Sequence, residues 1–207
     1  LEETSIELLS KGRQLADQLK VPLAAALAGN GVEELGVRLG QYGADKVYLA
    51  EHPLLKRYQA SSYAKAMCGL IVKHKPQIVL YGATPVGRDL APRIASAMKA
   101  GLTADCTDLQ IGRHEIKSTG QTFENLLLQI RPAFGGNIIA TIINYDRWPQ
   151  MATVREGVMP MPEPVGTRKA KVIREATDLT PSDLLVEILS EHRQQKKVNL
   201  KSSRIIV

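Results

Sequence analysis

Apolar and polar residues alternate along the first hundred positions in blocks that are typical of strands and helices in turn. Short apolar runs occur over 21–28, 46–50 and 78–82, and segments with helical spacing of apolar residues follow them over 32–42, 61–74 and 86–100. A further helical pattern opens the chain, where Thr4 and Glu7 have the spacing of a capping box. Repeated strand–helix units predict an α/β fold with a parallel sheet covered by helices on both faces.

The pattern changes after Gly101. Residues 105–119 and 124–130 have the composition of shorter strands, and residues 137–144 form a longer β-rich run. We therefore expect a β extension added to the parallel sheet rather than another pair of helices.

Prolines dominate the passage that follows. Four of them predict an extended, turn-rich segment, namely Pro149, Pro160, Pro162 and Pro164. Residues 171–176 predict one further strand. Residues 181–194 predict an amphipathic helix, with Thr180 as its cap and Pro181 at its first position.

Both ends of the sequence have the pattern of interrupted structure. An α/β chain that opens on a helix leads us to expect a strand before it. Residues 203–207 have the composition of a strand that has only begun. We therefore expect the sequence to be a piece of a longer protein.

Composition and charge exclude several classes of protein. The 207 residues are 44% hydrophobic and 23% charged, which excludes a disordered or collagen-like chain. No apolar run approaches the ~18 residues that would span a membrane, so no membrane insertion is expected. The formal net charge is +6, but only one Trp and two Phe accompany it, so nucleic-acid binding is not expected. Two cysteines, Cys68 and Cys106, are too few for a disulfide framework or a cysteine zinc site and indicate a reducing, cytosol-like compartment.

Standard catalytic motifs and metal-ligand spacings are absent from the sequence, so it predicts no catalytic residue and no metal site. The most informative segment is 81–93, which joins the carboxyl end of a predicted strand to the start of a helix, where parallel sheets place ligands. Gly82 and Gly87 allow a close backbone approach, Thr84 offers a hydroxyl, and Arg88 offers a planar cation. The alternative is an ordinary turn in which Arg88 and its neighbour Asp89 are paired or act as caps.

Two further segments place an arginine beside glycine in irregular backbone, where functional residues often lie. They are 131–137, which begins with Arg131, and 149–157, which contains Arg155. Buried ion pairs that tie loops together are the structural alternative for both arginines. Cys106 lies between Asp105 and Thr107, and a buried structural thiol is favoured there over a nucleophile.

Together these segments resemble the large (alpha) subunit of electron-transfer flavoproteins. The motifs are GATPVGRDLAPR at 82–93, GLTADCTDL at 101–109, RPAFGGN at 131–137, PQMATVREG at 149–157 and YGADKVY at 42–48. The resemblance implies a Rossmann-like, adenine-nucleotide-hydrolase-like three-layer domain over 1–165, followed by a linker strand and helix over 166–200. Residues 201–207 would then begin an FAD-binding domain that lies beyond this sequence.

The resemblance also implies a function. The chain would be the scaffold domain of a heterodimer, packing on a beta subunit and passing electrons through FAD to or from an acyl-CoA dehydrogenase or a quinone reductase. It would be mainly an electron carrier, in the cytoplasm or, in a eukaryote, in the mitochondrial matrix. The beta subunit would bind AMP or, in the electron-bifurcating branch, a second FAD, and that complex would oxidise NADH.

By motif match, the resemblance places Thr84 and Arg155 against the isoalloxazine ring of that second flavin, with Arg88 and Arg131 as second choices. An arginine there would stabilise a reduced anionic flavin, and a hydroxyl would tune its protonation. The strand–helix alternation by itself leaves another hypothesis open, an autonomous adenine-nucleotide-binding module of the universal-stress type. A hydrolase or transferase that uses Cys106 or Asp105 is the least favoured hypothesis.

Overall fold

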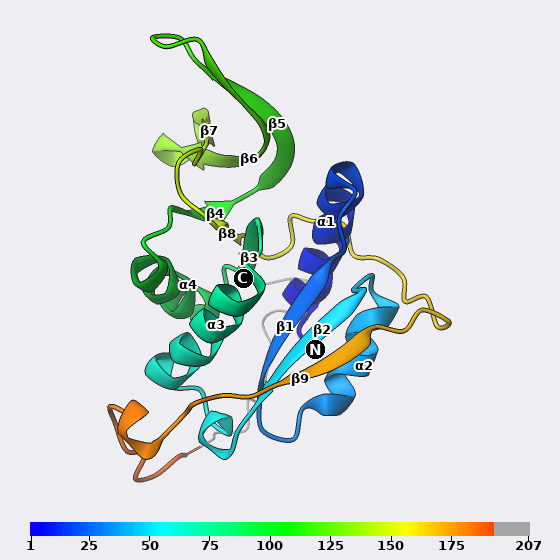
Figure 1. The fold of residues 1–207 in the computed structure, drawn as a ribbon, viewed down its shortest axis with the longest axis vertical. Coiled ribbons are helices and arrows are strands. Elements are labelled where there is room, and N and C mark those ends of the chain that lie inside the picture. The colour runs from blue at the N-terminus through cyan, green and yellow to red at the C-terminus, as the bar shows by residue number, and fades with distance from the viewer. Residues whose placement is uncertain (193–207) are drawn as a thin grey trace, which may run out of the picture.

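The computed structural model is described over residues 1–192, and its elements alternate between helices and strands through its first half (Figure 1). The helices are α1 (Glu3–Leu19), α2 (Glu33–Gln41), α3 (Ala60–His74) and α4 (Pro85–Met98), with short 3-10 turns η1 (Pro53–Leu55), η2 (Phe134–Gly136) and η3 (Pro181–Asp183). The strands are β1 (Ala24–Gly29), β2 (Lys46–Glu51), β3 (Ile78–Gly82), β4 (Leu102–Cys106), β5 (Asp108–Ile116), β6 (Gln121–Ala133), β7 (Ile138–Ile142), β8 (Gln150–Val154) and β9 (Lys171–Glu175).

Two three-stranded parallel sheets form the body of the molecule, in the orders β1–β2–β9 and β3–β8–β4. Helix α2 packs on β2 and β9, and α4 packs on β3, β4 and β8. Helix α3 contacts both α4 and the first sheet, so it joins the two halves. This arrangement confirms the predicted Rossmann-like α/β fold.

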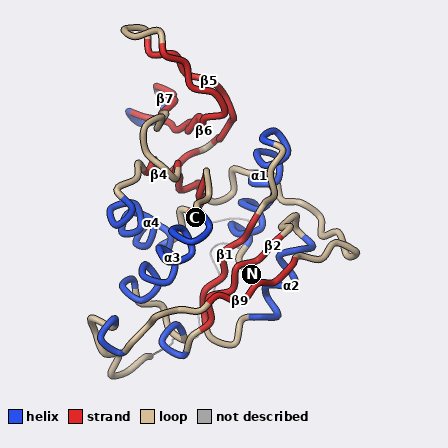
Figure 2. Tube along the Cα trace, viewed as in Figure 1, coloured by secondary structure: helices blue, strands red, loops and turns tan. Residues whose placement is uncertain are grey.

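An antiparallel arm projects from this body. Strands β5, β6 and β7 pair in that order, and Figure 2 shows them extending away from the helices. At the base of the arm, Leu109 and Leu127 are fully buried against Cys106, Ala152 and Val154 of the parallel sheet. The predicted β extension is therefore confirmed, and its base belongs to the same core as the strands β4 and β8.

Strand β8 corrects the prediction of an irregular, turn-rich passage after Pro149. All five of its residues are buried, and it lies between β3 and β4 in the second sheet. A strand buried on both faces lacks the alternation of apolar and polar residues by which a strand is predicted. The prolines around this segment therefore led to the prediction of turns. The Gln150 carboxamide oxygen accepts a hydrogen bond from the Leu127 N–H at 2.9 Å, which fastens β8 to the arm.

Strand β9 confirms the strand predicted over 171–176, and it pairs with β2. The domain boundary expected at residue 165 stays a prediction. The helix predicted over 181–194 is wrong for the described residues, because only η3 is helical there. Thr180 does cap η3, but Leu185 and Leu189 are 79% and 86% exposed, so their apolar face is not buried and does not stabilise a longer helix. Residues 193–207, with the expected end of the linker and the last strand, lie outside the described residues.

The capping box predicted at the first helix is also wrong. The N-cap of α1 is Glu2, which makes no side-chain cap bond, and Thr4 is buried inside the helix. The Glu7 carboxylate instead accepts a hydrogen bond from the Gly157 N–H at 3.0 Å. A residue distant in sequence therefore satisfies Glu7, and local spacing does not reveal that contact.

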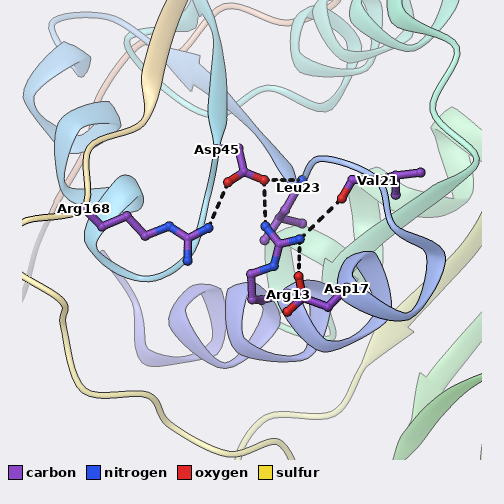
Figure 3. A network of polar contacts seen from close by, with 6 residues as sticks. All are labelled: Arg13, Asp17, Val21, Leu23, Asp45 and Arg168. Carbon is purple, nitrogen blue, oxygen red and sulfur yellow. Dashed lines mark hydrogen bonds and ion pairs between the residues drawn. The ribbon is translucent and has the colours of Figure 1, made fainter.

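A network of polar contacts closes the amino ends of β1 and β2 (Figure 3). The Asp45 carboxylate accepts hydrogen bonds from the Leu23 N–H at 2.8 Å, from Arg13 Nη1 at 2.6 Å and from Arg168 Nη2 at 2.8 Å. Arg13 also pairs with Asp17 at 2.7 Å. One carboxylate thus joins α1, the starts of two strands and the segment that leads into β9.

None of the helices within residues 1–192 has the length and apolar character needed to cross a lipid bilayer.

Candidate functional site

The loops that follow three parallel strands meet at the carboxyl edge of the second sheet. The Ala83 N–H, just after β3, donates to the Val154 carbonyl oxygen at 2.7 Å. The Arg155 N–H, just after β8, donates to the Cys106 carbonyl oxygen at 2.9 Å. Backbone hydrogen bonds therefore bring together the two segments that carry Thr84 and Arg155.

Thr84 is the N-cap of helix α4, and its Oγ1 accepts a hydrogen bond from the Gly87 N–H at 3.1 Å. Pro85 occupies the first turn, where its missing N–H costs nothing. Because Oγ1 acts as the acceptor in this cap, the hydroxyl hydrogen is still able to donate to another group.

The two glycines of this loop pack against the chain itself. A Cβ at Gly87 would lie 1.8 Å from the Gly82 carbonyl oxygen, and a Cβ at Gly82 would lie 2.7 Å from Thr4 Cγ2. Close packing between helix and strand therefore accounts for both residues, which the sequence had suggested for the approach of a ligand.

Arg88 and Arg155 share one carboxylate. Arg88 Nη2 lies 3.2 Å from Asp105 Oδ1, and Arg155 Nη2 lies 2.7 Å from Asp105 Oδ2. Arg88 Nε also donates to the Ala83 carbonyl oxygen at 2.7 Å. Arg88 thus pairs with Asp105 and not with its sequence neighbour.

The alternative of an ordinary turn, in which Arg88 and Asp89 are paired or act as caps, therefore holds in part, because both residues are paired but not with each other. Asp89 lies one position further along α4, where it accepts a hydrogen bond from Tyr58 Oη at 2.8 Å. It also pairs with Arg93, one helical turn away, at 3.1 Å.

Asp105 is held in an unusual backbone conformation. Its φ is +63°, in the left-handed region, and its N–H donates to Thr153 Oγ1 at 2.8 Å. The hydrogen bond from Arg155, aided by the charges of Arg88 and Arg131, lowers the pKa of Asp105 below its ordinary value. Asp105 is therefore a carboxylate at neutral pH.

Sequence analysis missed Asp105 as the anchor of the two arginines. The available signal was a single acidic residue at the start of the strand predicted over 105–119, and Asp tolerates the left-handed region better than most residues. That signal does not identify which arginines Asp105 would contact, because they come from other elements.

Arg131 lies in β6, opposite Ala140 of β7, two residues before the strand ends. Its charge acts on both Asp105 and Cys106, so it belongs to the same neighbourhood as the other two arginines. All four residues proposed from the sequence, Thr84, Arg88, Arg131 and Arg155, are thus placed around the ends of β3, β4 and β8.

Cys106 is fully buried. Burial raises the pKa of its thiol to about 11, although the charge of Arg131 opposes that shift. A protonated, inaccessible thiol is a weak nucleophile, so the geometry favours the structural interpretation of Cys106.

The arrangement presents hydrogen-bond donors outward. The side chains of Arg88 and Arg155 are 59% and 45% exposed, while the Asp105 side chain beneath them is 21% exposed. Two guanidinium groups contact one carboxylate, and the charge of Arg131 also acts on it, so these four groups together carry an excess of positive charge. Such a site suits a ligand that is anionic or rich in acceptor atoms.

Comparison with known proteins identifies the family. The sequence profile of the electron transfer flavoprotein domain matches residues 1–179. Electron transfer flavoprotein subunit alpha of Thermoanaerobacterium thermosaccharolyticum is 47% identical over 208 residues, which cover 100% of this chain and 60% of that protein.

Two relatives with other names have sequence identities to this chain in the same range. Acryloyl-CoA reductase electron transfer subunit beta of Anaerotignum propionicum is 40% identical over 99% of this chain and 60% of that protein. Protein FixB of Clostridium saccharobutylicum is 42% identical over 100% of this chain and 59% of that protein. The chain therefore spans about 60% of the length of the relatives that it matches. On the match over residues 1–179 and these identities, the chain belongs to the electron transfer flavoprotein family.

Proposed function

We propose that this chain is the scaffold portion of an electron-transfer flavoprotein alpha subunit, which packs on a beta subunit and serves the transfer of electrons to or from a dehydrogenase or reductase. The family and the names of the relatives support this function, since one of them is an electron transfer subunit of acryloyl-CoA reductase. The alpha-subunit FAD would be held by a portion of the whole protein that this chain does not contain.

The observation that carries the finer proposal is the outward-facing pair Arg88 and Arg155 on Asp105. These donors, with the Thr84 hydroxyl, fit the acceptor atoms of an isoalloxazine ring or the phosphate of AMP. We propose that they bind and orient a nucleotide of the beta subunit, with Arg131 adding positive charge. A flavin bound there would supply reversible uptake of electrons, and the chain's own residues would fix the charge that surrounds it.

A second flavin in the beta subunit would place the complex in the electron-bifurcating branch, with NADH as the electron donor. The test is to produce the full-length alpha subunit with its beta subunit and to measure the absorbance spectrum and the number of flavins per heterodimer. Two flavins support bifurcation, and one flavin with bound AMP supports simple electron transfer. A complex that stays colourless contradicts the flavoprotein function.

Arg155→Ala tests the site itself, with Arg93→Ala as a matched control. Both arginines are exposed and paired with an aspartate, but Arg93 pairs with Asp89 on α4 instead of Asp105. We expect Arg155→Ala to weaken binding of the beta-subunit nucleotide or to shift its midpoint potential, while Arg93→Ala leaves both unchanged. Unchanged nucleotide content and potential in Arg155→Ala would remove Arg155 from the site.

An autonomous adenine-nucleotide-binding module is the second candidate, favoured by the parallel strands that lead into the N-terminus of α4. It predicts that the isolated chain binds AMP or ATP. Titration calorimetry with each nucleotide discriminates between the two functions, because the scaffold function expects no appreciable heat from the chain without its partner.

A further inference from the structure

We propose that Asp105 is a positioning residue that aligns Arg88 and Arg155 and offsets part of their charge toward the nucleotide of the neighbouring subunit. This inference rests on the proposed function, because it assumes that the site faces that nucleotide.

The first argument is the sharing of the carboxylate. Each oxygen of Asp105 takes a different arginine, and the two arginines come from α4 and from the loop after β8. Asp105 is less exposed than either of them, at 21% against 59% and 45%. The carboxylate therefore lies beneath the two guanidinium groups and determines where their outer N–H groups point.

The second argument is that the backbone of Asp105 is fixed independently of the two guanidinium groups. Its N–H is bound to Thr153 Oγ1, and its neighbour Cys106 is fully buried, with its carbonyl oxygen bound to the Arg155 N–H. A left-handed φ further limits the backbone conformations of Asp105. The carboxylate is thus a fixed point to which longer, more flexible side chains are fastened.

Arg88 and Arg155 depend on the Asp105 carboxylate to different degrees. Arg88 has a second anchor, since its Nε donates to the Ala83 carbonyl oxygen at 2.7 Å. The Arg155 side chain is held through its bond to Asp105. Loss of the carboxylate is therefore expected to disturb Arg155 more than Arg88.

The third argument is electrostatic. With Arg88, Arg131 and Arg155 charged, Asp105 leaves two positive charges in excess, and its removal would leave three. A more positive site favours whichever state of a neighbouring ligand is more negative. Asp105 therefore moderates the effect of the arginines on the charge of that ligand.

The experiment uses the full-length alpha subunit in complex with its beta subunit, in four forms: wild type, Asp105→Asn, Arg155→Ala and Asp89→Asn. Asparagine has the shape of aspartate and tolerates the left-handed region, so Asp105→Asn removes charge and is expected to keep the fold. Asp89→Asn is the matched control, because Asp89 also pairs with an arginine of α4, but that arginine is Arg93, which does not contact Asp105 in the described residues.

The measured quantity is the midpoint potential of the beta-subunit flavin. We expect Asp105→Asn to raise it, because the lost negative charge acts on the ligand directly and outweighs the weaker hold on Arg155, while Arg88 keeps its anchor on the Ala83 carbonyl oxygen. Arg155→Ala is expected to lower it, and Asp89→Asn to leave it unchanged. If the beta subunit holds AMP, the AMP dissociation constant is measured in the same four forms. It is then expected to fall by about two- to fivefold in Asp105→Asn and to rise by a similar factor in Arg155→Ala.

A second readout needs no bound nucleotide. Because the pKa of Asp105 is lowered in the folded chain, the wild type loses a stabilising contribution as the pH falls through that pKa, and Asp105→Asn has no such contribution to lose. The difference in unfolding free energy between the two nucleotide-free complexes is therefore expected to shrink below pH about 4.

The outcomes separate the two proposals. An effect of Arg155→Ala without an opposite effect of Asp105→Asn overturns the assignment of Asp105 and leaves the proposed function standing. If neither variant changes the potential or the AMP affinity, the site does not face the nucleotide, and the finer proposed function fails. A change in Asp89→Asn equal to that in Asp105→Asn also overturns the assignment, because it shows a general effect of surface charge.

Discussion

At the scale of single residues, two aspartates each hold two arginines, in different settings. Asp45 takes Arg13 and Arg168 at the amino ends of β1 and β2, and it also accepts the Leu23 N–H (Figure 3). Its arginine side chains are 19% and 37% exposed, less than the two that Asp105 holds. The Asp45 network is therefore placed to stabilise the fold, whereas the two arginines on Asp105 are exposed to solvent.

Asp45→Asn is expected to lower the free energy of unfolding by about 1–2 kcal/mol, because charged hydrogen bonds to two arginines are lost and the carboxylate is partly screened by solvent. Urea unfolding of the purified chain measures the effect. Asp17→Asn is the control, since Asp17 is 67% exposed and pairs with Arg13 within α1, and it is expected to change stability by less than about 0.5 kcal/mol. Equal effects of the two substitutions would contradict a stabilising role of the Asp45 network.

The same carboxylate predicts a pH dependence. Burial acts to raise the pKa of Asp45, but the Leu23 N–H, Arg13 and Arg168 together lower it overall. A lowered folded-state pKa means that the stabilisation is complete above the ordinary value and is lost as the pH falls through the folded value. The stability difference between wild type and Asp45→Asn is therefore expected to shrink as the pH falls below about 4 and to disappear once the pH is below the folded-state pKa; a difference that does not shrink with falling pH would exclude this origin.

At the scale of elements, the packing of α4 on β3 depends on a glycine. Gly87→Ala would place a Cβ 1.8 Å from a backbone oxygen that no side-chain rotation moves, so we expect a loss of about 1–3 kcal/mol or more. Gly69→Ala is the control, because Gly69 is exposed in α3 and has nothing within 4 Å of a new Cβ. It is expected to gain about 0.5–1 kcal/mol, since alanine is the better helix former. Thermal unfolding of both variants checks these signs.

The sequence allowed most elements before β4 to be predicted, because helical and strand periodicities alternate there with clear breaks. It did not reveal β8, whose Met151–Val154 run is buried on both faces and so has no alternating pattern. It predicted a helix after Pro181 that is not formed there. The capping residues at Thr180 favour a helix locally, but Leu185 and Leu189 are exposed, so no buried apolar face stabilises it. Periodicity reports local burial, and both errors concern burial that tertiary packing decides.

The site was predictable to the extent that motifs carry it. Thr84, Arg88 and Arg155 lie in glycine-containing segments at strand ends, and the resemblance to a family singled them out. Asp105 required coordinates, because its partners come from α4 and from the loop after β8. A contact between residues far apart in the sequence leaves no local spacing to detect.

At the scale of the whole molecule, β9 returns from far along the chain to complete the first sheet. Its last residue, Glu175, is 7% exposed and bonds to Lys73 and, at 2.8 Å, to His74 Nε2, both at the end of α3. The hydrogen bond from Lys73, followed by that from His74, lowers the pKa of Glu175. These contacts fasten the late segment of the chain to an early helix.

Glu175→Gln is expected to weaken this attachment by about 1–2 kcal/mol, because the ion pair between the buried carboxylate and Lys73 is lost. Limited proteolysis of the segment after β9 would then be about five- to thirtyfold faster, provided that cleavage follows the open population. Asp178→Asn, at an exposed position in the same segment, is the control. Unchanged cleavage in Glu175→Gln would show that other contacts hold β9.

The strand order β3–β8–β4 also has a consequence for biosynthesis. A nascent chain emerging from the ribosome makes β3 and β4 first and must then produce the whole antiparallel arm before the strand that belongs between them exists. Closing so long a connection is slow compared with pairing neighbours in sequence. Arg155 follows that late strand directly, so the arginine pair on Asp105 is assembled only when the sheet is finished.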